Sequence, residues 1–136
     1  MKHFVLCLAL LGVIAGGAMA QPYKVVFDLT SRDSLDQKAV LRWIKEVVGV
    51  NPRAELEVVM YAKGLEMVVP EKSGVTRDVE EAMKNPNISF KVCEIAMKNN
   101  KLDKSQLMKG VGTVPDGIYE IYSKQREGWG YIKVSH

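Results

Sequence analysis

Short apolar runs alternate along this sequence with stretches whose apolar residues recur at the spacing of a helix. A chain that alternates in this way builds a parallel sheet with helices on both faces. The sequence therefore predicts one α/β domain with a mostly parallel five-stranded sheet, and it leaves the order of the strands open. The expected strands are residues 24–29, 55–61, 88–92, 111–114 and 129–134, and the expected helical segments are 35–48, 65–70, 76–84, 94–100 and 117–126.

Capping and breaking residues set the expected helix ends. Asp33 or Ser34 can cap the first long helix, and Gly49 and Asn51-Pro52 are expected to end it. Thr76 is the expected cap of the second helix. Pro115 suits the first position of the last helix, because a proline there loses no hydrogen bond.

The first residues have the pattern of a secretory signal peptide. Lys2 is followed by an uncharged apolar stretch at 4–14 and by the small-residue motif Ala-Met-Ala at 18–20. We expect cleavage after this motif, so that residues 1–20 are removed and 21–136 form a periplasmic or secreted domain with no membrane segment. An uncleaved anchor is the alternative, although several glycines interrupt the apolar stretch.

Charge and histidine content exclude several classes of function. The net charge is only +3, and no basic stripe carries interleaved aromatic residues, so nothing indicates nucleic acid as a partner. His3 falls in the signal peptide, and we expect His136, the last residue, to be mobile. A folded body without histidine argues against Ser-His-Asp or Cys-His catalysis and against a transition-metal site. The spacing of the glycines matches no nucleotide-binding motif, so we expect no cofactor.

Cys93 is the one cysteine of the expected mature chain, since Cys7 falls in the signal peptide. Cys93 lies where the third apolar run meets a helical pattern, and ligands of parallel sheets bind outside the carboxyl ends of the strands. The first turn of a helix favours an anion, and the nucleophilic form of cysteine is the thiolate. Glu94 would oppose the thiolate and Lys91 would partly offset that. The alternative is a buried cysteine that only fills space.

Other residues are weaker candidates for a ligand crevice near the same edge. Asp28 lies near the end of the first strand, and Gly64 follows the second, where a glycine permits close approach of a ligand. Pro115, Asp116 and Gly117 follow the fourth strand. Each also has a structural interpretation, as a cap for Asp28 and as turn residues for the others. Three aromatic residues are expected in the core or at subunit contacts: Trp43, Trp129 and Tyr131.

Several segments taken together resemble the DsrE/DsrF-like proteins of sulfur metabolism. They are VVFDLTS, VVMYAKGLEMV, FKVCEIAMK, LMKGVGTVPDGIYEI and QREGWGYIK, which occur in the family's order over residues 23–134. The resemblance implies a three-layer α/β/α sandwich and a homo-oligomer, often a trimer or hexamer. It also implies that Cys93 carries sulfane sulfur as a persulfide, between donors and acceptors that are proteins or small sulfur compounds. Family members commonly work in the cytoplasm, and the signal peptide departs from that.

Three functions remain open at this point. The chain can be a sulfurtransferase-like sulfur carrier that uses Cys93. It can instead be a non-catalytic oligomer, structural or binding a small ligand in crevices near Gly64 and residues 115–117. Thirdly, two Cys93 thiols can pair between subunits in a redox protein, although the absence of a C-x-x-C motif excludes thioredoxin-like chemistry.

Overall fold

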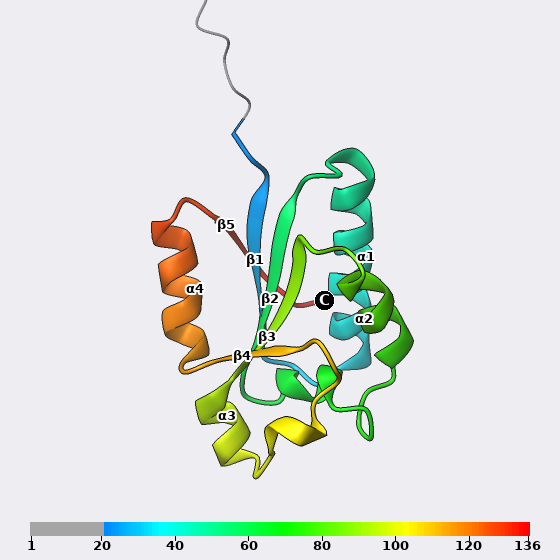
Figure 1. Ribbon diagram of the computed structural model, residues 1–136, viewed down its shortest axis with the longest axis vertical. Coiled ribbons are helices and arrows are strands. Elements are labelled where there is room, and N and C mark those ends of the chain that lie inside the picture. The colour runs from blue at the N-terminus through cyan, green and yellow to red at the C-terminus, as the bar shows by residue number, and fades with distance from the viewer. Residues whose placement is uncertain (1–20) are drawn as a thin grey trace, which may run out of the picture.

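The computed structural model describes residues 21–136, and the predicted signal peptide lies outside the described residues. Five parallel strands form one sheet in the order β4-β3-β2-β1-β5. Helices cover both faces, so the α/β/α sandwich is confirmed (Figure 1). The strands are β1 (Lys24–Leu29), β2 (Glu55–Met60), β3 (Ile88–Cys93), β4 (Gly112–Val114) and β5 (Gly130–Lys133). The α-helices are α1 (Ser34–Val50), α2 (Thr76–Met83), α3 (Glu94–Asn99) and α4 (Gly117–Arg126), and the 3-10 helices are η1 (Gly64–Val68) and η2 (Lys104–Gln106).

The path of the chain places α4 apart from the other long helices. From β1 to β4 the strands are added in one direction, and α1 and α2 lie on one face of the sheet (Figure 1). The chain then returns past β1 to add β5 at the opposite edge. Because crossovers between parallel strands are right-handed, a reversal of direction brings the connecting helix to the other face. Therefore α4 lies on the face opposite α1 and α2.

The two faces of the sheet are packed very differently. The face under α1 and α2 holds a continuous apolar core that includes Phe27, Leu56 and Phe90, and Trp43 stacks on Phe27 with ring centroids 6.4 Å apart. The face under α4 holds a small cluster of buried residues, Val26, Val59 and Ile121, with Tyr61 and Trp129 packed against it. The α4 face therefore has room for polar side chains.

The end of α1 falls within the expected stop, whereas Pro115 does not take the expected place in α4. The carboxylate of Asp33 caps α1 by accepting the N–H of Leu35 at 2.8 Å, and the helix runs through Gly49 to Val50, with Asn51 as its C-cap. One glycine near a helix end costs only about 1 kcal/mol relative to alanine, which the rest of a long amphipathic helix outweighs. Pro115 lies before α4, because Asp116 occupies the N-cap position.

The start of α2 also differs from the expectation. Thr76 is the first residue of the helix, and Val75 is its N-cap. The hydroxyl of Ser73 accepts the N–H of Val75 at 3.2 Å. This serine shapes the turn that leads into the helix, so no cap from Thr76 is formed.

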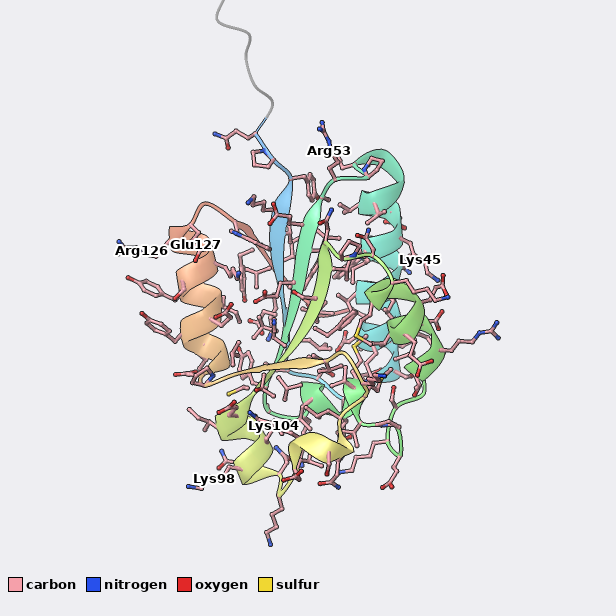
Figure 2. The ribbon with its side chains drawn as sticks, viewed as in Figure 1. Lys45, Arg53, Lys98, Lys104, Arg126 and Glu127 are labelled. Atoms are coloured by element: carbon pink, nitrogen blue, oxygen red, sulfur yellow. The ribbon has the colours of Figure 1, made fainter. Side chains whose placement is uncertain are left out.

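Charged side chains cover the outside of the domain. Figure 2 shows Lys45, Lys98 and Arg126 at the periphery, pointing away from the sheet. Within residues 21–136, no helix combines the length and the apolar character that crossing a membrane requires.

Candidate functional site

Cys93 lies at the carboxyl edge of the sheet, where β3 becomes α3. It is the last residue of β3 and the N-cap residue of α3, and its strand has neighbours on both sides. The side chain is buried, with 5% of its surface exposed. Gly117 at the start of α4 covers it so closely that a Cβ atom on Gly117 would lie 3.1 Å from the Cβ of Cys93. The thiol is thus at the carboxyl end of its strand, as predicted, but it lies beneath α4.

The charged neighbours of Cys93 in the sequence are engaged elsewhere. Glu94 accepts a hydrogen bond from the hydroxyl of Thr113 at 2.8 Å and forms an ion pair with Lys104 at 3.0 Å. These two partners lower the pKa of Glu94. Lys91 extends over Gly112, the residue beside it on β4. The carboxylate of Glu94 is therefore neutralised by partners that the sequence did not indicate.

Asp28 is the centre of a polar cluster on the α4 face. Its carboxylate is buried near the end of β1 and accepts hydrogen bonds from the phenol of Tyr131 at 2.6 Å and from the ammonium of Lys133 at 3.2 Å. The same ammonium donates to the hydroxyl of Thr30 at 2.9 Å. Tyr131 and Lys133 reach Asp28 because β5 is the parallel neighbour of β1.

Two phenols in this cluster are held in their protonated form. Burial, followed by the charge of Asp28 and a hydrogen bond with it, raises the pKa of Tyr61 to about 12, and the charge of Cys93 contributes. The hydrogen bond with Asp28, followed by burial, raises the pKa of Tyr131 to about 12. At neutral pH both side chains are therefore hydrogen-bond donors.

A pocket of about 280 Å³ separates this cluster from α4. Ligand pockets of parallel sheets lie at the carboxyl ends of the strands, and this pocket is at that end. Tyr61 lines the pocket, and Gly117 joins it to the thiol: a Cβ atom on Gly117 would be 3.5 Å from the Tyr61 ring and 3.1 Å from the Cβ of Cys93. The lining residues are Asp28, Tyr61, Ile118, Ile121, Tyr122, Gln125 and Tyr131.

The predicted crevice residues have separate roles. Asp28 lines the pocket and caps no helix. Gly64 packs against the end of β1, where a Cβ atom would lie 2.1 Å from the carbonyl oxygen of Leu29. Pro115 is exposed, and Asp116 caps α4 by accepting the N–H of Ile118 at 2.9 Å. The structure thus brings Gly117 onto the thiol, places Asp28 in the wall of the pocket, and uses Gly64 and Asp116 for packing and capping.

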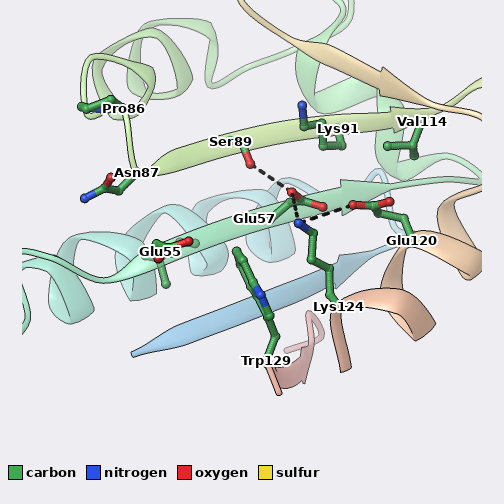
Figure 3. A pocket seen from close by; sticks show the side chains of 11 residues that line it. Glu55, Glu57, Pro86, Asn87, Ser89, Lys91, Val114, Glu120, Lys124 and Trp129 are labelled. Carbon is green, nitrogen blue, oxygen red and sulfur yellow. Dashed lines mark hydrogen bonds and ion pairs between the residues drawn. The ribbon is translucent and has the colours of Figure 1, made fainter. Parts of the chain in front are cut away.

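A second polar cluster, which the sequence analysis missed, surrounds Glu57 in the middle of β2 (Figure 3). Glu57 is only 4% exposed, and its Oε2 atom is 3.3 Å from the hydroxyl of Ser89 and 3.6 Å from the ammonium of Lys124. Its Oε1 atom is buried without a hydrogen-bond partner among residues 21–136. A pocket of about 390 Å³ lies beside it, with Glu120 and Lys124 of α4 in its wall.

The surroundings of Glu57 favour its neutral form. Burial is the largest cause, and the neighbouring carboxylate of Glu120 is the next; together they raise the pKa of Glu57 from 4.5 to about 7. Lys124 and Lys91 lower it and only partly compensate. The alternation of Glu55 and Glu57 with apolar residues was the available sequence signal, because it places both glutamates on one face of the strand.

His136 also differs from the expectation. Its Nδ1 atom is 2.9 Å from a carboxylate oxygen of Asp36, a buried residue in the first turn of α1. The nearby Val134 is buried, and its N–H donates to the carbonyl of Asp28 at 2.9 Å. The segment after β5 is thus part of the folded domain. In residues 21–136, no three His, Cys, Asp or Glu side chains are grouped so that they could hold a metal ion.

Comparison with known proteins finds similar folds. A protein of unknown function from Methanobacterium thermoautotrophicum, MTH1491, is 26% identical, with a TM-score of 0.77 over 82% of this chain and 98% of that one. The ychN protein from E. coli is 13% identical, with a TM-score of 0.66 over the same shares of the two chains. No family model and no curated protein matches the sequence. The structural neighbours show that this chain has a fold found in both a methanogen and a bacterium.

Proposed function

We propose that this chain is a DsrE/DsrF-like sulfur carrier in which Cys93 takes up sulfane sulfur as a persulfide. The observation that carries the proposal is the place of the thiol: a free cysteine at the carboxyl edge of a parallel sheet, with Tyr61 near it. The resemblance of the segment around Cys93 to that family supports the same role. The fold shared with MTH1491 is compatible with it.

The reaction needs only one thiol. The Cys93 thiolate attacks the outer sulfur of a donor persulfide, a new S–S bond forms to Cys93, and the donor leaves as a thiolate. An acceptor thiolate then attacks the outer sulfur of the Cys93 persulfide and restores the Cys93 thiolate. Each sulfur transfer replaces one S–S bond by another, so no external oxidant or reductant is consumed.

Intact-protein mass spectrometry tests the proposal directly. After incubation with a small-molecule persulfide donor, we expect an adduct of about 32 Da, one sulfur atom, that a thiol reductant removes. The variant Cys93→Ser is the control and should acquire no adduct. An unchanged mass for the wild-type protein under conditions that load glutathione would reject the function. The same spectrum, taken on material from the cell, tests cleavage after Ala20 and the proposed export.

A second candidate is a non-catalytic protein that binds a small ligand. The burial of Cys93 favours it, because α4 covers the thiol while the pocket at Asp28, Tyr61 and Tyr131 is open. In the organism of origin, this function predicts that Cys93→Ser leaves the phenotype intact, whereas a folded Asp28→Asn variant does not. Direct disulfide pairing of two copies, the third function, would require α4 to move first.

Assembly into a homo-oligomer is part of the proposal. The outward side of α4 carries three large exposed side chains: Ile118 (64%), Tyr119 (66%) and Tyr122 (52%). A short helix with this composition is typical of a surface that another protein covers. We propose that a second copy of the chain covers it.

A further inference from the structure

Helix α4 covers the side chain of Cys93, which is 5% exposed. Gly117, in the first turn of this helix, lies on the Cys93 side chain. The buried apolar contacts beneath α4 are few and centre on Val26, Val59 and Ile121. A helix with so small an apolar contact depends on its polar contacts to stay in place.

Those polar contacts converge on one buried carboxyl group. Glu57 projects from β2 toward α4, and Figure 3 shows Lys124 and Glu120 facing it from that helix and Ser89 from β3. Lys124 is 3.6 Å from Glu57 and 3.7 Å from Glu120, longer than a strong charged hydrogen bond. Lys91 of β3 lines the same pocket. One oxygen of Glu57 remains without a partner among the described residues.

The other charged groups around this carboxyl are already engaged. Glu55 is paired with Lys24 at 2.9 Å, and the ammonium of Lys124 lies 4.5 Å from the centre of the Trp129 ring. A buried oxygen without a partner is rare and costly. A proton on that oxygen would turn it into a donor, and the carboxylate of Glu120, 3.7 Å from the same Lys124 ammonium, is the acceptor that faces it from α4.

We propose that Glu57 and Glu120 share one proton that fastens α4 over Cys93, so that loss of the proton loosens the helix and opens the thiol. The neutral carboxyl of Glu57 donates to the carboxylate of Glu120, and Lys124 balances the remaining charge. When the proton passes to water, two carboxylates face each other beside one ammonium. We call this proton-dependent closure of α4 over Cys93 the lid. The relevance of the lid to sulfur transfer rests on the proposed function, whereas the lid itself does not.

The pH range follows from the two states of Glu57. Beneath α4 its pKa is about 7, and in an open, solvated state it returns toward 4.5. Below pH 4.5 both states bind the proton, and closure is strongest. Between pH 4.5 and 7 only the closed state keeps the proton, so closure weakens as pH rises, and above pH 7 the effect levels off. Over this range we expect the open fraction to rise roughly tenfold to a hundredfold.

Labelling of Cys93 at different pH values tests the lid. The rate is measured with dithiodipyridine, which reacts with thiols in acid, and is divided by the rate of N-acetylcysteine at the same pH. In wild-type protein the normalised rate should rise between pH 4.5 and 7 and then level off. Glu57→Gln keeps a donor toward Glu120 but cannot ionise, so its normalised rate should be slow and independent of pH. Glu55→Gln, from the same strand and pocket, should behave as wild type.

A replacement variant and a measurement of persulfide loading distinguish failure of the lid from failure of the proposed function. If Glu57→Gln does not fold, Glu120→Ala replaces it, because loss of the acceptor should reduce the slope of the profile. A flat wild-type profile, or an equal slope in Glu57→Gln, would overturn the lid. Persulfide loading is measured on the same proteins. A protein that loads sulfur with a flat profile loses the lid and keeps the function, whereas a sloped profile without loading keeps the lid and loses the function.

Discussion

Asp28 is the residue on which the polar cluster near the thiol depends. It accepts hydrogen bonds from Tyr131 and Lys133 while being buried, so its replacement by Asn leaves a cationic donor without its anion. We expect Asp28→Asn to lower the free energy of unfolding by about 1–3 kcal/mol, measured with urea. Asp78→Asn, which breaks an exposed ion pair with Lys45, should change it by less than about 0.5 kcal/mol.

The same variant has a spectroscopic consequence. Asp28 is a cause of the raised pKa of both Tyr61 and Tyr131, which are at about 12. In Asp28→Asn these two phenols should titrate closer to 10, the ordinary value. Absorbance of tyrosinate near the alkaline limit of stability measures the shift. An unchanged titration curve in a folded variant would contradict the placement of the cluster.

Two glycines in α-helices should respond in opposite ways to alanine. A Cβ atom on Gly117 would lie 3.1 Å from the Cβ of Cys93 and 3.2 Å from a methyl group of Val59, neither of which can move freely. We expect Gly117→Ala to cost about 1–3 kcal/mol of unfolding free energy. Gly49→Ala meets nothing within 4 Å and should stabilise α1 by about 0.5–1 kcal/mol. Equal effects at both sites would show that Gly117 is not packed on the thiol.

The sequence predicted where Cys93 lies, but it could not show that α4 packs over the thiol. The change from an apolar run to a helical pattern placed Cys93 at the end of β3, because both periodicities are local. Its burial depends on Gly117, which reaches Cys93 only after the chain has crossed to the other face. Tyr131 and Lys133 were missed as partners of Asp28 for the same reason: their contact requires β5 to lie beside β1.

Strands and helices as units were predicted better than their ends and their order. The span of β1 and the span of α4 agree with the expected residues, since each has a complete apolar pattern with polar residues on both sides. The residues that precede α2 and α4 were misjudged, because Ser73 and Asp116 supply hydrogen bonds there instead of the expected Thr76 and Pro115. Strand order depends on contacts between distant segments, about which local periodicity carries no information.

The start of α1 should show a pH-dependent contact with the segment after β5. Burial by itself would raise the pKa of Asp36, but hydrogen bonds with His136 and Ser31 lower it overall. The hydrogen bond with Asp36 raises the pKa of His136. The histidine's contribution to stability is therefore complete below its unfolded value of 6.5 and is lost as pH rises through the raised value. The contribution of Asp36 is present above 3.8 and is lost as pH falls through the lowered value.

The variant His136→Asn isolates this contact. Wild type should exceed it in unfolding free energy between the two pKa values, near pH 5.5, and the difference should disappear toward pH 9. Ser135→Ala, at the exposed neighbouring position, serves as the control and should follow wild type at each pH. A difference that does not change with pH would mean that His136 contributes only packing.

The two faces of the sheet differ in what they contribute: one holds the main hydrophobic core, and the other holds the polar clusters and covers Cys93. The face under α1 and α2 buries the large aromatic and aliphatic side chains, which provides the stability. The face under α4 holds the two buried carboxylates of the sheet, Asp28 and Glu57, and the helix that covers Cys93. Because few apolar contacts hold α4, its position can respond to protons and to a partner without loss of the main core.

If a second copy covers α4, assembly and access to the thiol are coupled. Light scattering should give a mass above the 15.2 kDa of one full chain, and the double variant Ile118→Ser, Tyr119→Ser should weaken association at least about tenfold. Leu35→Ser removes an exposed apolar side chain from α1 on the opposite face and should leave the mass unchanged. Since an uncovered α4 is free to lift, Cys93 in the double variant should also be labelled faster at pH 7. A wild-type monomer, or an equal effect of Leu35→Ser, would show that α4 is not the contact.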